Sequence, residues 1–274
     1  MKKKILIFGE SIIDKHEDYD VIAGAPLHVA VNLKKKSLEP YLLTAVGSDK
    51  NGDKIFNFLK KNKLKLNYIE KKLNLKTGEA IVSKKQNGNS FKLPNYCAWD
   101  EIETIPSFTP YLLYTGSIVA RSSKNLNTLK EILKKNINYI FFDLNLRMPY
   151  INWNFISFLI KVKITHLKLT ENEYIYLRKK SNNLFTIKNL FKINKKLEFV
   201  ALTKGVRGSE IFLRNNIILK HSDTKIKFFF NSVGAGDVFS AILIKGILKR
   251  ENLIDSYFEA INAAGKSILK KTSY

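Results

Sequence analysis

Length, composition and charge already exclude several classes of protein. The chain has 274 residues, of which 45% are hydrophobic and 12% aromatic. That is enough to bury a sizeable core in one or two domains, or in a single large α/β domain, and it excludes a wholly disordered chain. The single cysteine, Cys97, excludes a disulfide framework and any all-cysteine metal site.

The net charge of +23 comes from 47 basic residues against 24 acidic ones. Such an excess can mark a nucleic-acid or acidic-membrane partner. Only six of the basic residues are arginines, however, and the lysines are spread along the whole chain in short runs. Because base readout and bidentate phosphate recognition favour arginine, we interpret the charge as a compositional bias and expect no specific nucleic-acid partner. A nucleic-acid-binding protein is the alternative that the charge alone supports.

The N-terminus begins like a signal peptide, with three lysines before the apolar run Ile5–Phe8. That run stops after four residues, which is too short for the apolar region of a secretory signal. The longest apolar stretches are far shorter than the roughly 18 residues that span a bilayer. We therefore expect a cytoplasmic protein without a membrane partner.

Short apolar runs alternate with longer amphipathic stretches along the chain. Buried strands are expected at Ile5–Phe8, Leu42–Val46, Leu112–Tyr114, Tyr139–Phe142, Thr165–Leu169 and Phe199–Leu202. Helices are expected at Pro26–Lys36, Asn51–Lys63, Lys124–Lys135, Asn172–Lys179, Ile187–Lys195, Val238–Lys249 and Leu253–Lys271. The alternation predicts an α/β fold with a mostly parallel sheet, helices on both faces, and ligands beyond the C-terminal ends of the strands.

One segment breaks this rhythm, between Thr77 and Leu93. Two partly alternating stretches there flank Asn87-Gly88, a dipeptide typical of a tight hairpin turn. A hairpin that leaves a parallel sheet is a candidate lid over a site, although an edge hairpin without a function fits the same pattern. No linker or repeat divides the chain. We therefore expect one domain, 1–274, with a discontinuous β lid that includes about residues 77–95.

A small, glycine-rich turn opens directly into an apolar helix at Asn231–Phe239, which reads NSVGAGDVF. Gly234 and Gly236 let the backbone approach a ligand closely, and the helix N-terminus adds partial positive charge, so the turn predicts an anion site. Asp237 would repel a bound phosphate. Its carboxylate makes sense if it takes a proton from an attacking hydroxyl while the amides stabilise the transferring phosphoryl group. An ordinary helix cap with an acidic first turn is the alternative.

The segment Val233–Asp237 resembles the C-terminal signature of the PfkB carbohydrate kinases, the ribokinase-like family. The resemblance runs through nearly the whole chain in the family's order. Its further motifs are Gly9–Asp14, Ala23–Ala30, Val46–Gly52, Asn95–Asp100, Thr115–Ser117, Phe142–Arg147, Lys168–Glu173 and Thr203–Gly208. The elements GESIID, GAPLHVAV, AWD and DLNLR look most like the bacterial fructokinase branch.

The resemblance implies a ribokinase-like three-layer α/β/α fold with a mostly parallel central sheet and a small β lid. It implies an ATP-dependent sugar kinase, most similar to a fructokinase, in which phosphoryl transfer depends on positioning and charge neutralisation. The implied cofactors are ATP and Mg²⁺, with a monovalent cation such as K⁺ as a further option. The implied partners are a small sugar and ATP, and we expect a homodimer that pairs through the β lid.

The same resemblance implies roles for individual residues. Asp237 would be the general base on the sugar hydroxyl, with the amides of Gly234, Ala235 and Gly236 as the anion hole. The sugar side of the site would use Asp14, Gly24, Ala25, His28, Arg121, Asn145 and Arg147. The nucleotide side would use Lys168, Thr203, Gly205, Gly208 and Asn262, and Glu173 would organise magnesium and its waters. Turn caps, strand ends and surface ion pairs are the ordinary structural interpretations of the same residues.

The chain departs from the family pattern at several positions. His28 stands where the family usually has Asn, Thr170 replaces the Asn before the magnesium-linked Glu, and Asn231-Ser232 replaces Asp-Thr before the signature. The chain also ends soon after Lys271, so we expect some nucleotide contacts made by the longer tail of relatives to be missing. Because residue 28 normally contacts the sugar, ribose, 2-keto-3-deoxygluconate or a nucleoside stays open as the acceptor beside fructose. A non-catalytic homologue that only binds ligands is a further alternative.

Overall fold

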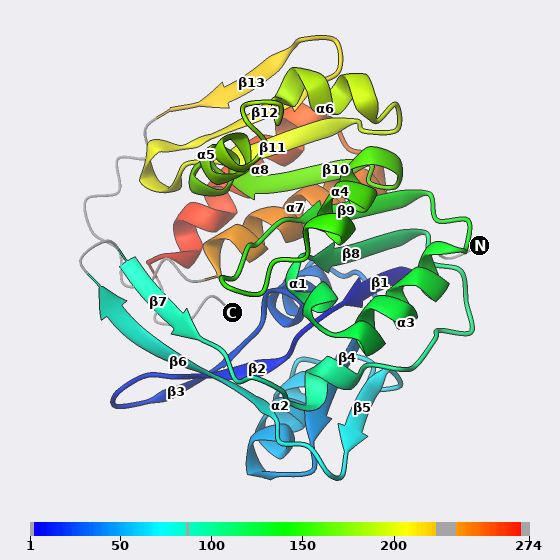
Figure 1. Cartoon of the computed structure of the whole chain (residues 1–274), viewed down its shortest axis with the longest axis vertical. Helices are drawn as coiled ribbons and strands as arrows, with labels where there is room; N and C mark the ends of the chain where they lie inside the picture. The colour runs from blue at the N-terminus through cyan, green and yellow to red at the C-terminus, as the bar shows by residue number, and fades with distance from the viewer. Residues whose placement is uncertain (1–2, 86–87, 223–233, 270–274) are drawn as a thin grey trace.

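Nine strands form one large sheet at the centre of the molecule (Figure 1). The structure is a computed structural model that describes residues 3–85, 88–222 and 234–269. The sheet order is β13-β12-β11-β10-β9-β8-β1-β4-β5. The strands are β1 (Ile5–Phe8), β4 (Pro40–Gly47), β5 (Ile69–Lys72), β8 (Leu112–Gly116), β9 (Tyr139–Asp143), β10 (His166–Thr170), β11 (Phe199–Thr203), β12 (Ser209–Leu213) and β13 (Ile218–His221). All neighbouring strands are parallel except β11–β12 and β12–β13, which are antiparallel.

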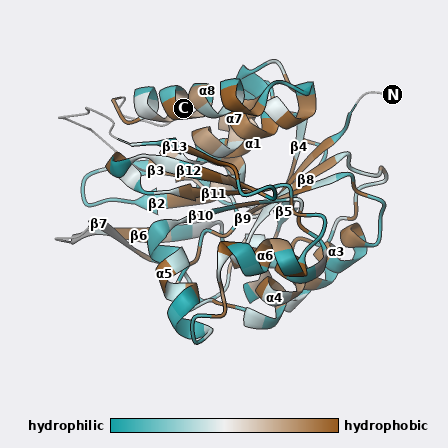
Figure 2. Cartoon of the chain, turned by 90° about the horizontal axis from the view of Figure 1, so that it is seen from above, coloured by the Kyte–Doolittle hydropathy of each residue, from teal (hydrophilic) through white to brown (hydrophobic). Residues whose placement is uncertain are grey.

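Helices cover both faces of this sheet, as Figure 2 shows from above. One layer consists of α1 (Ala25–Lys35), α2 (Lys50–Lys61), α7 (Ala235–Lys249) and α8 (Leu253–Ser267). The opposite layer consists of α3 (Ser123–Leu133), α4 (Trp153–Val162), α5 (Glu171–Lys180) and α6 (Ile187–Ile193). The expected three-layer α/β/α fold with a mostly parallel sheet is therefore confirmed.

Each strand divides its side chains between two apolar cores because successive side chains of a strand point to opposite faces. In β1, Ile5 and Ile7 pack with the layer of α1, α2, α7 and α8. Leu6 and Phe8 pack with the layer of α3 to α6. All four side chains are at most 2% exposed. A strand buried on both faces reads as a continuous apolar run, which is why the sequence predicts this strand at its observed bounds.

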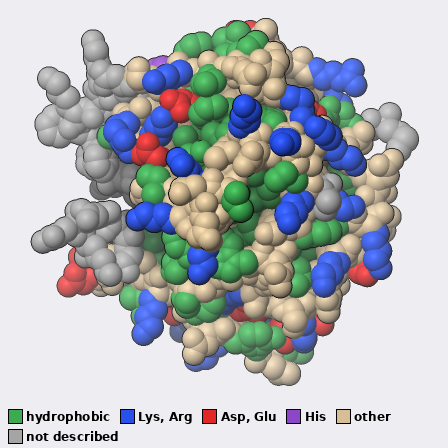
Figure 3. Space-filling model, turned by 45° about the horizontal axis from the view of Figure 1, so that its top comes forward, with side chains coloured by type: hydrophobic (Ala, Val, Ile, Leu, Met, Phe, Trp, Pro, Cys, Tyr) green, Lys and Arg blue, Asp and Glu red, His purple; other side chains and the backbone are tan. Residues whose placement is uncertain are grey.

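The basic side chains do not gather in one patch on the face drawn in Figure 3. Lysine and arginine are spread there among hydrophobic and uncharged side chains. Among the described residues, no helix combines the length and the apolar character needed to cross a membrane.

A second, four-stranded sheet extends from the main one, with the order β3-β2-β6-β7 (Figure 1). Its strands are β2 (Ile12–Lys15), β3 (Asp20–Ala23), β6 (Gly78–Lys85) and β7 (Gly88–Lys92). The hairpin predicted around Asn87-Gly88 is present as the antiparallel pair β6 and β7. The residue Asn87 itself lies outside the described residues. Strand β2 pairs with β6 in parallel and with β3 in antiparallel orientation, so segments far apart in sequence build this sheet together.

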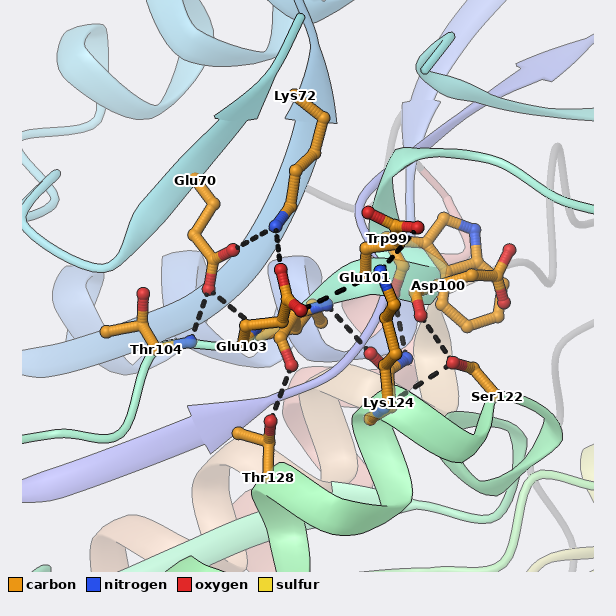
Figure 4. A network of polar contacts seen from close by, with 12 residues as sticks. Glu70, Lys72, Trp99, Asp100, Glu101, Glu103, Thr104, Ser122, Lys124 and Thr128 are labelled. Carbon is orange, nitrogen blue, oxygen red and sulfur yellow. Dashed lines mark hydrogen bonds and ion pairs between the residues drawn. The ribbon is translucent and has the colours of Figure 1, made fainter. Parts of the chain in front are cut away.

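Polar contacts fix the chain where it returns from the second sheet (Figure 4). The carboxylate of Glu70 accepts hydrogen bonds from the backbone N–H groups of Glu103 (2.9 Å) and Thr104 (2.7 Å). Lys72 forms ion pairs with Glu70 (2.8 Å) and Glu103 (3.0 Å). The hydroxyl of Thr128 in α3 donates to the carbonyl of the neighbouring residue 102 at 2.7 Å. These contacts hold residues 102–104 against β5 of the main sheet and against α3.

Candidate active site

The N-terminus of α7 lies at the C-terminal edge of the main sheet, where the fold predicts ligand binding. Gly234 precedes the helix with a φ of +85°, a left-handed conformation that suits glycine. Ala235, Gly236 and Asp237 form the first turn. The N–H of Asp237 donates to the Gly234 carbonyl at 3.0 Å. The N–H groups before it stand at the start of the helix, where no carbonyl of an earlier turn precedes them. The side chain of Asp237 is 14% exposed. The preceding residues Asn231 and Ser232 lie outside the described residues.

His28 in α1 holds the Asp237 carboxylate. Its Nδ1 lies 2.9 Å from Asp237 Oδ2, and its Nε2 lies 3.3 Å from the backbone oxygen of Ile22 in β3. Burial alone would lower the pKa of this imidazole, but the hydrogen bond and the charge of Asp237 outweigh burial, and the pKa of His28 lies above its usual value. The structure thus brings the predicted sugar-side residue His28 directly to the predicted base.

Two further carboxyl groups are buried beside this pair. Glu10 Oε2 and Asp14 Oδ1 are buried and have no hydrogen-bond partner among the described residues. Burial raises the pKa of Glu10 to about 7 and that of Asp14 to about 6, although the positive charge of Arg147 acts in the opposite direction on both. Buried polar atoms almost always have a hydrogen-bond partner, so these two oxygens are suited to a ligand that carries hydroxyl groups.

Arg147 follows β9 and links the main sheet to the second one. Its guanidinium lies 5.3 Å from the centre of the Phe91 ring in β7, close enough for a cation–π contact. Asn145, two residues earlier, has a φ of +40°, and its carbonyl accepts a hydrogen bond from Ser117 Oγ at 3.5 Å. The loop after β9 therefore carries both predicted sugar-side residues at the junction of the two sheets.

Gly24 and Ala25 begin α1 and lie against the backbone of Glu10. Gly24 has a φ of +119°, and a Cβ atom there would lie 2.5 Å from the Glu10 carbonyl oxygen. Only glycine fits this close approach of two chain segments. The backbone N–H of Ala25 faces the Glu10 carboxyl and helps to stabilise its charged form. Both residues thus shape the backbone around the buried acids.

Arg121 has a different place from the one expected. Its Nε donates to Asp100 Oδ1 at 2.7 Å, and its Nη1 donates to the Pro94 carbonyl at 3.0 Å. Its guanidinium lies 4.1 Å from the Trp99 ring and 4.8 Å from the Tyr150 ring. These contacts hold the segment that leaves the second sheet, so they serve the fold and not the predicted sugar contact.

A cavity of about 440 Å³ opens on the other side of the α7 N-terminus. Six predicted residues from separate segments line it together: Lys168, Thr203, Gly205, Gly208, Ala235 and Gly236. Its remaining lining is largely apolar and comes mainly from α7 and α8. Asn262 is exposed and is not among the lining residues, because α8 turns Ile261, Ala264, Gly265 and Ile268 toward the cavity instead. The place of Asn262 beside a bound base stays a prediction.

Lys168 lies beneath the glycine turn as a buried cation. Its Nζ contacts the Asp143 carboxylate oxygens at 3.0 and 2.9 Å, and a Cβ atom added to Gly236 would lie 2.9 Å from Nζ. Asp143 also accepts hydrogen bonds from Ser240 (3.1 Å) and Tyr114 (3.3 Å). Burial alone would lower the pKa of Lys168, but the charges of Asp143 and Asp237 outweigh it and raise the pKa. The amine therefore stays charged where the cavity meets the turn.

Glu173 lies in the first turn of α5 and forms a capping box with Thr170. Its Oε1 accepts from the backbone N–H of Leu146 at 2.6 Å, and its Oε2 accepts from the backbone N–H of Thr170 at 2.7 Å. Among the described residues, no group of three or more His, Cys, Asp or Glu side chains is placed to hold a metal ion. A magnesium ion that keeps most of its waters needs no such cage, and each oxygen of Glu173 retains a lone pair for a bound water.

Two features of the site are missing from the sequence-based predictions. Glu10 stands directly after the first strand, a position that could have marked it as a site residue, but an acidic residue after Gly9 also fits an ordinary turn. The apolar face of α8 recurs with the spacing 261, 264, 265 and 268. That spacing is typical of any helix packed against a core, so it cannot by itself distinguish a nucleotide cavity from a helix interface.

Comparisons with known proteins identify the family and the fold of the chain. The family model described as "pfkB family carbohydrate kinase" matches residues 2–274. A protein of Pyrococcus horikoshii described as an uncharacterized sugar kinase, PH1459, is 26% identical over 248 residues, which cover 84% of this chain and 74% of that protein.

Solved structures share the fold over nearly the whole chain. The PH1459 structure in complex with ATP has a TM-score of 0.80 at 23% identity and covers 98% of this chain and 93% of that one. A Vibrio cholerae fructokinase with fructose, ADP and calcium has a TM-score of 0.81 at 18% identity, covering 99% and 94%. The aminoimidazole riboside kinase of Salmonella enterica, with its riboside and an ATP analogue, has a TM-score of 0.83 at 17% identity, covering 99% and 95%.

Proposed function

The chain belongs to the pfkB family of carbohydrate kinases, and from this premise we propose that it transfers the γ-phosphoryl group of ATP to a hydroxyl of a small sugar. Fructose is the first acceptor to test. The observation that carries the proposal is the position of Asp237, at a helix N-terminus between a cavity and a cluster of buried carboxyl groups. A base in that position can face a hydroxyl on one side and a phosphoryl group on the other.

The sugar would bind against Glu10 and Asp14. Their buried, unpartnered oxygens can accept hydrogen bonds from hydroxyl groups, and a hydrogen bond to a charged group contributes about 1.5–3 kcal/mol. Arg147, Asn145 and the backbone at Gly24 would complete this side. Arg121 is left out of this proposal because it already donates hydrogen bonds to Asp100 and Pro94.

The nucleotide would occupy the cavity of about 440 Å³ between the main sheet and α8. Its base would lie against the apolar face of α8, near Ile261 and Ile268. Its phosphates would run along Gly205 and Gly208 toward the first turn of α7, where Lys168 and the amides of Ala235 and Gly236 supply positive charge. Glycine at these positions lets the phosphates approach the backbone.

Transfer would follow from the position of Asp237 between the two ligands. Asp237 takes the proton of the acceptor hydroxyl, and the oxygen forms its bond to phosphorus as the bond to ADP breaks. The helix N-terminus stabilises the charge on the transferring group. Bound Mg²⁺ supplies charge neutralisation on the phosphates, and Glu173 would hold it through water. A monovalent cation such as K⁺ stays an untested addition.

The second sheet would act as a lid over the sugar. It carries Asp14 on β2, and the Arg147–Phe91 contact joins its β7 strand to the main body. A closed lid excludes water and so limits the hydrolysis of ATP. Pairing of two chains through this sheet stays a prediction.

A second class of compound is a candidate for the acceptor. His28 replaces the usual Asn on the sugar side, and the similar structures include a nucleoside kinase of Methanocaldococcus jannaschii and an aminoimidazole riboside kinase. A nucleoside or riboside therefore competes with fructose for the same cleft.

The test is a panel of acceptors with MgATP. ADP release is followed with fructose, ribose, 2-keto-3-deoxygluconate and nucleosides, and the acceptors are ranked by kcat/KM because specificity is a ratio. We expect one class to exceed the others clearly, with fructose first. Binding of ATP and sugar by calorimetry without turnover of any acceptor would reject a catalytic role.

A further inference from the structure

The contact between His28 and Asp237 fixes where the protons of the site lie. Nε2 of His28 faces the backbone oxygen of Ile22 at 3.3 Å, and a carbonyl oxygen can only accept a hydrogen bond. Nε2 must therefore carry a hydrogen. This assigns the tautomer of the ring from its surroundings, since the neutral ring has only one N–H.

The other nitrogen then has a constrained partner. Nδ1 lies 2.9 Å from Asp237 Oδ2, a distance that requires one proton between the two atoms. With Nε2 already protonated, that proton makes the ring an imidazolium beside a carboxylate, or leaves a neutral ring beside a carboxylic acid. In both cases Oδ2 of Asp237 is occupied, and Oδ1 is the oxygen that can receive a proton from a substrate.

The charges around the ring favour the imidazolium. Asp237 from α7 and Asp14 from β2 face His28, and both raise the pKa of the ring against the effect of burial. The charge of Asp237 raises the pKa of Glu10, which follows β1, and the charge of Arg147, which follows β9, lowers the pKa of both Glu10 and Asp14. The imidazole thus interacts with two carboxyl groups, those of Asp237 and Asp14, a setting in which a positive ring is stabilised.

We propose that His28 is a positioning residue which bridges the second sheet to the base and, as an imidazolium, holds Asp237 ionised with Oδ1 directed at the acceptor hydroxyl. The inference rests on the proposed function, because it deepens the role of Asp237 in it. During transfer the O–H bond of the acceptor breaks and an O–H bond forms at Oδ1. The electron pair left on the acceptor oxygen forms the bond to phosphorus, and ADP leaves with the pair of the broken P–O bond.

The bridge also connects the base to the second sheet. Ile22 lies in β3, which pairs with β2 at Ile13, next to Asp14. A movement of this sheet therefore moves both the sugar-binding carboxylate and the oxygen that holds the Nε2–H. The imidazole has two separate nitrogens, which face Ile22 and Asp237 from different sides of the ring. An asparagine at position 28 carries both of its N–H groups on one nitrogen, and its side-chain oxygen only accepts hydrogen bonds, so it cannot make the same bridge.

The first experiment measures the protonation of His28 and does not require turnover of any substrate. In the full chain labelled with ¹⁵N-histidine, which has four histidines, the His28 signals are assigned by their loss in His28→Gln. We expect both His28 nitrogens to stay protonated up to a higher pH in the wild-type than in Asp237→Asn, and the neutral ring in Asp237→Asn to carry its hydrogen on Nε2. A neutral His28 with hydrogen on Nδ1, or the same titration in both proteins, would overturn the inference.

The second experiment uses the acceptor identified by the panel. Wild-type kcat should fall at alkaline pH as His28 loses its proton, because the lone pair on Nδ1 then faces a carboxylate. His28→Asn and His28→Gln should lower kcat by roughly 10²-fold, leave the KM for ATP unchanged and lack this alkaline decline. A variant that keeps the wild-type kcat and its alkaline decline contradicts the inference. Protonated ring nitrogens without turnover of any acceptor would instead reject only the proposed function.

Discussion

At the scale of single residues, the most unusual feature is a pair of buried acids, Glu10 and Asp14, each with one carboxyl oxygen that accepts no hydrogen bond among the described residues. Glu10 is 7% exposed, and burial raises its pKa from 4.5 to about 7. A carboxyl group held in this way costs folding free energy once it ionises. The sugar-free protein therefore carries a strained site, which a ligand with hydroxyl groups would relieve.

Replacement of Glu10 by glutamine tests this cost. Below the unfolded pKa of 4.5 the carboxyl is neutral in both states, and the wild-type loses stability as the pH rises toward 7, the pKa in the folded protein. The shift corresponds to about 3 kcal/mol. We expect Glu10→Gln to gain up to about that free energy of unfolding over wild-type between pH 5 and pH 8. Urea unfolding of the unliganded protein at both pH values measures it.

Glu17→Gln is the matched control for this comparison. Glu17 is exposed and lies in the same part of the chain. Its replacement should leave the pH dependence of stability as in the wild-type. Equal stability differences for Glu10→Gln at pH 5 and pH 8 would show that the Glu10 carboxyl does not titrate in this window.

Residue by residue, the sequence predicts most of the site. Asp237, His28, Lys168 and the glycines come together because motif order places them at strand ends that meet at one edge of the sheet. Arg121 is outside this pattern, since Asp100 accepts its hydrogen bonds, and this pairing depends on a tertiary contact across 21 residues. A single sequence does not reveal such a partner.

At the scale of elements, two glycines line the cavity proposed for the nucleotide: Gly205 begins the short 3-10 turn Gly205–Arg207, and Gly208 follows it. Gly208 has a φ of +93°, and a Cβ there would lie 2.0 Å from the His221 carbonyl oxygen. Gly205 has a φ of +61°, and nothing lies within 4 Å of its Cβ position. The two positions differ in the space around them while both line the cavity.

Alanine at these two positions should therefore have different effects. Gly208→Ala forces the residue before β12 away from the end of β13 and should lower the free energy of unfolding by roughly 3 kcal/mol or more, since steric clash adds to backbone strain. Gly205→Ala should cost about 1 kcal/mol from its backbone conformation alone. Thermal unfolding and ATP titration compare them. Equal losses in both variants would contradict the close contact at His221.

The predicted and observed elements differ where the sequence lacks a clear period. Strands β1, β4, β8, β9, β10 and β11 are buried on both faces, so their apolar runs identify them. Helix α4, which reads WNFISFLIKV, is not among the expected helices. Its polar residues at 154, 157 and 161 have a helical spacing, but so short and mostly apolar a segment also fits a buried strand. Strands β12 and β13 form an edge hairpin of mixed polarity. They lack the continuous apolar run that identifies a strand buried on both faces, so the sequence does not predict them.

At the scale of the whole molecule, the two sheets meet around the buried acids and the base. Asp14 belongs to the second sheet, Asp237 to the main body, and His28 contacts both. Motif order alone predicts that these residues share a site. The division of the site between two sheets follows only from the pairing of β2 with β6 across more than sixty residues, which local sequence patterns do not encode.

Loss of the Phe91 ring tests whether the second sheet closes over the sugar. Phe91→Ala removes the cation–π contact with Arg147, which contributes about 0.5–2 kcal/mol. We expect the KM for the sugar to rise several-fold and the KM for ATP to stay unchanged. Ile81→Ala, at a 55% exposed position of the same sheet, is the control and should change neither. An unaltered sugar KM in Phe91→Ala would count against a lid.

The turnover of Asp237→Asn tests the central claim most directly. The substitution keeps the shape of the side chain and removes its ability to accept a proton. We predict that kcat falls by roughly 10²–10⁴-fold on the preferred acceptor, while calorimetry shows ATP binding close to that of the wild-type. A variant that phosphorylates the sugar at a near-normal rate would contradict the account, because the proton would then leave by another group.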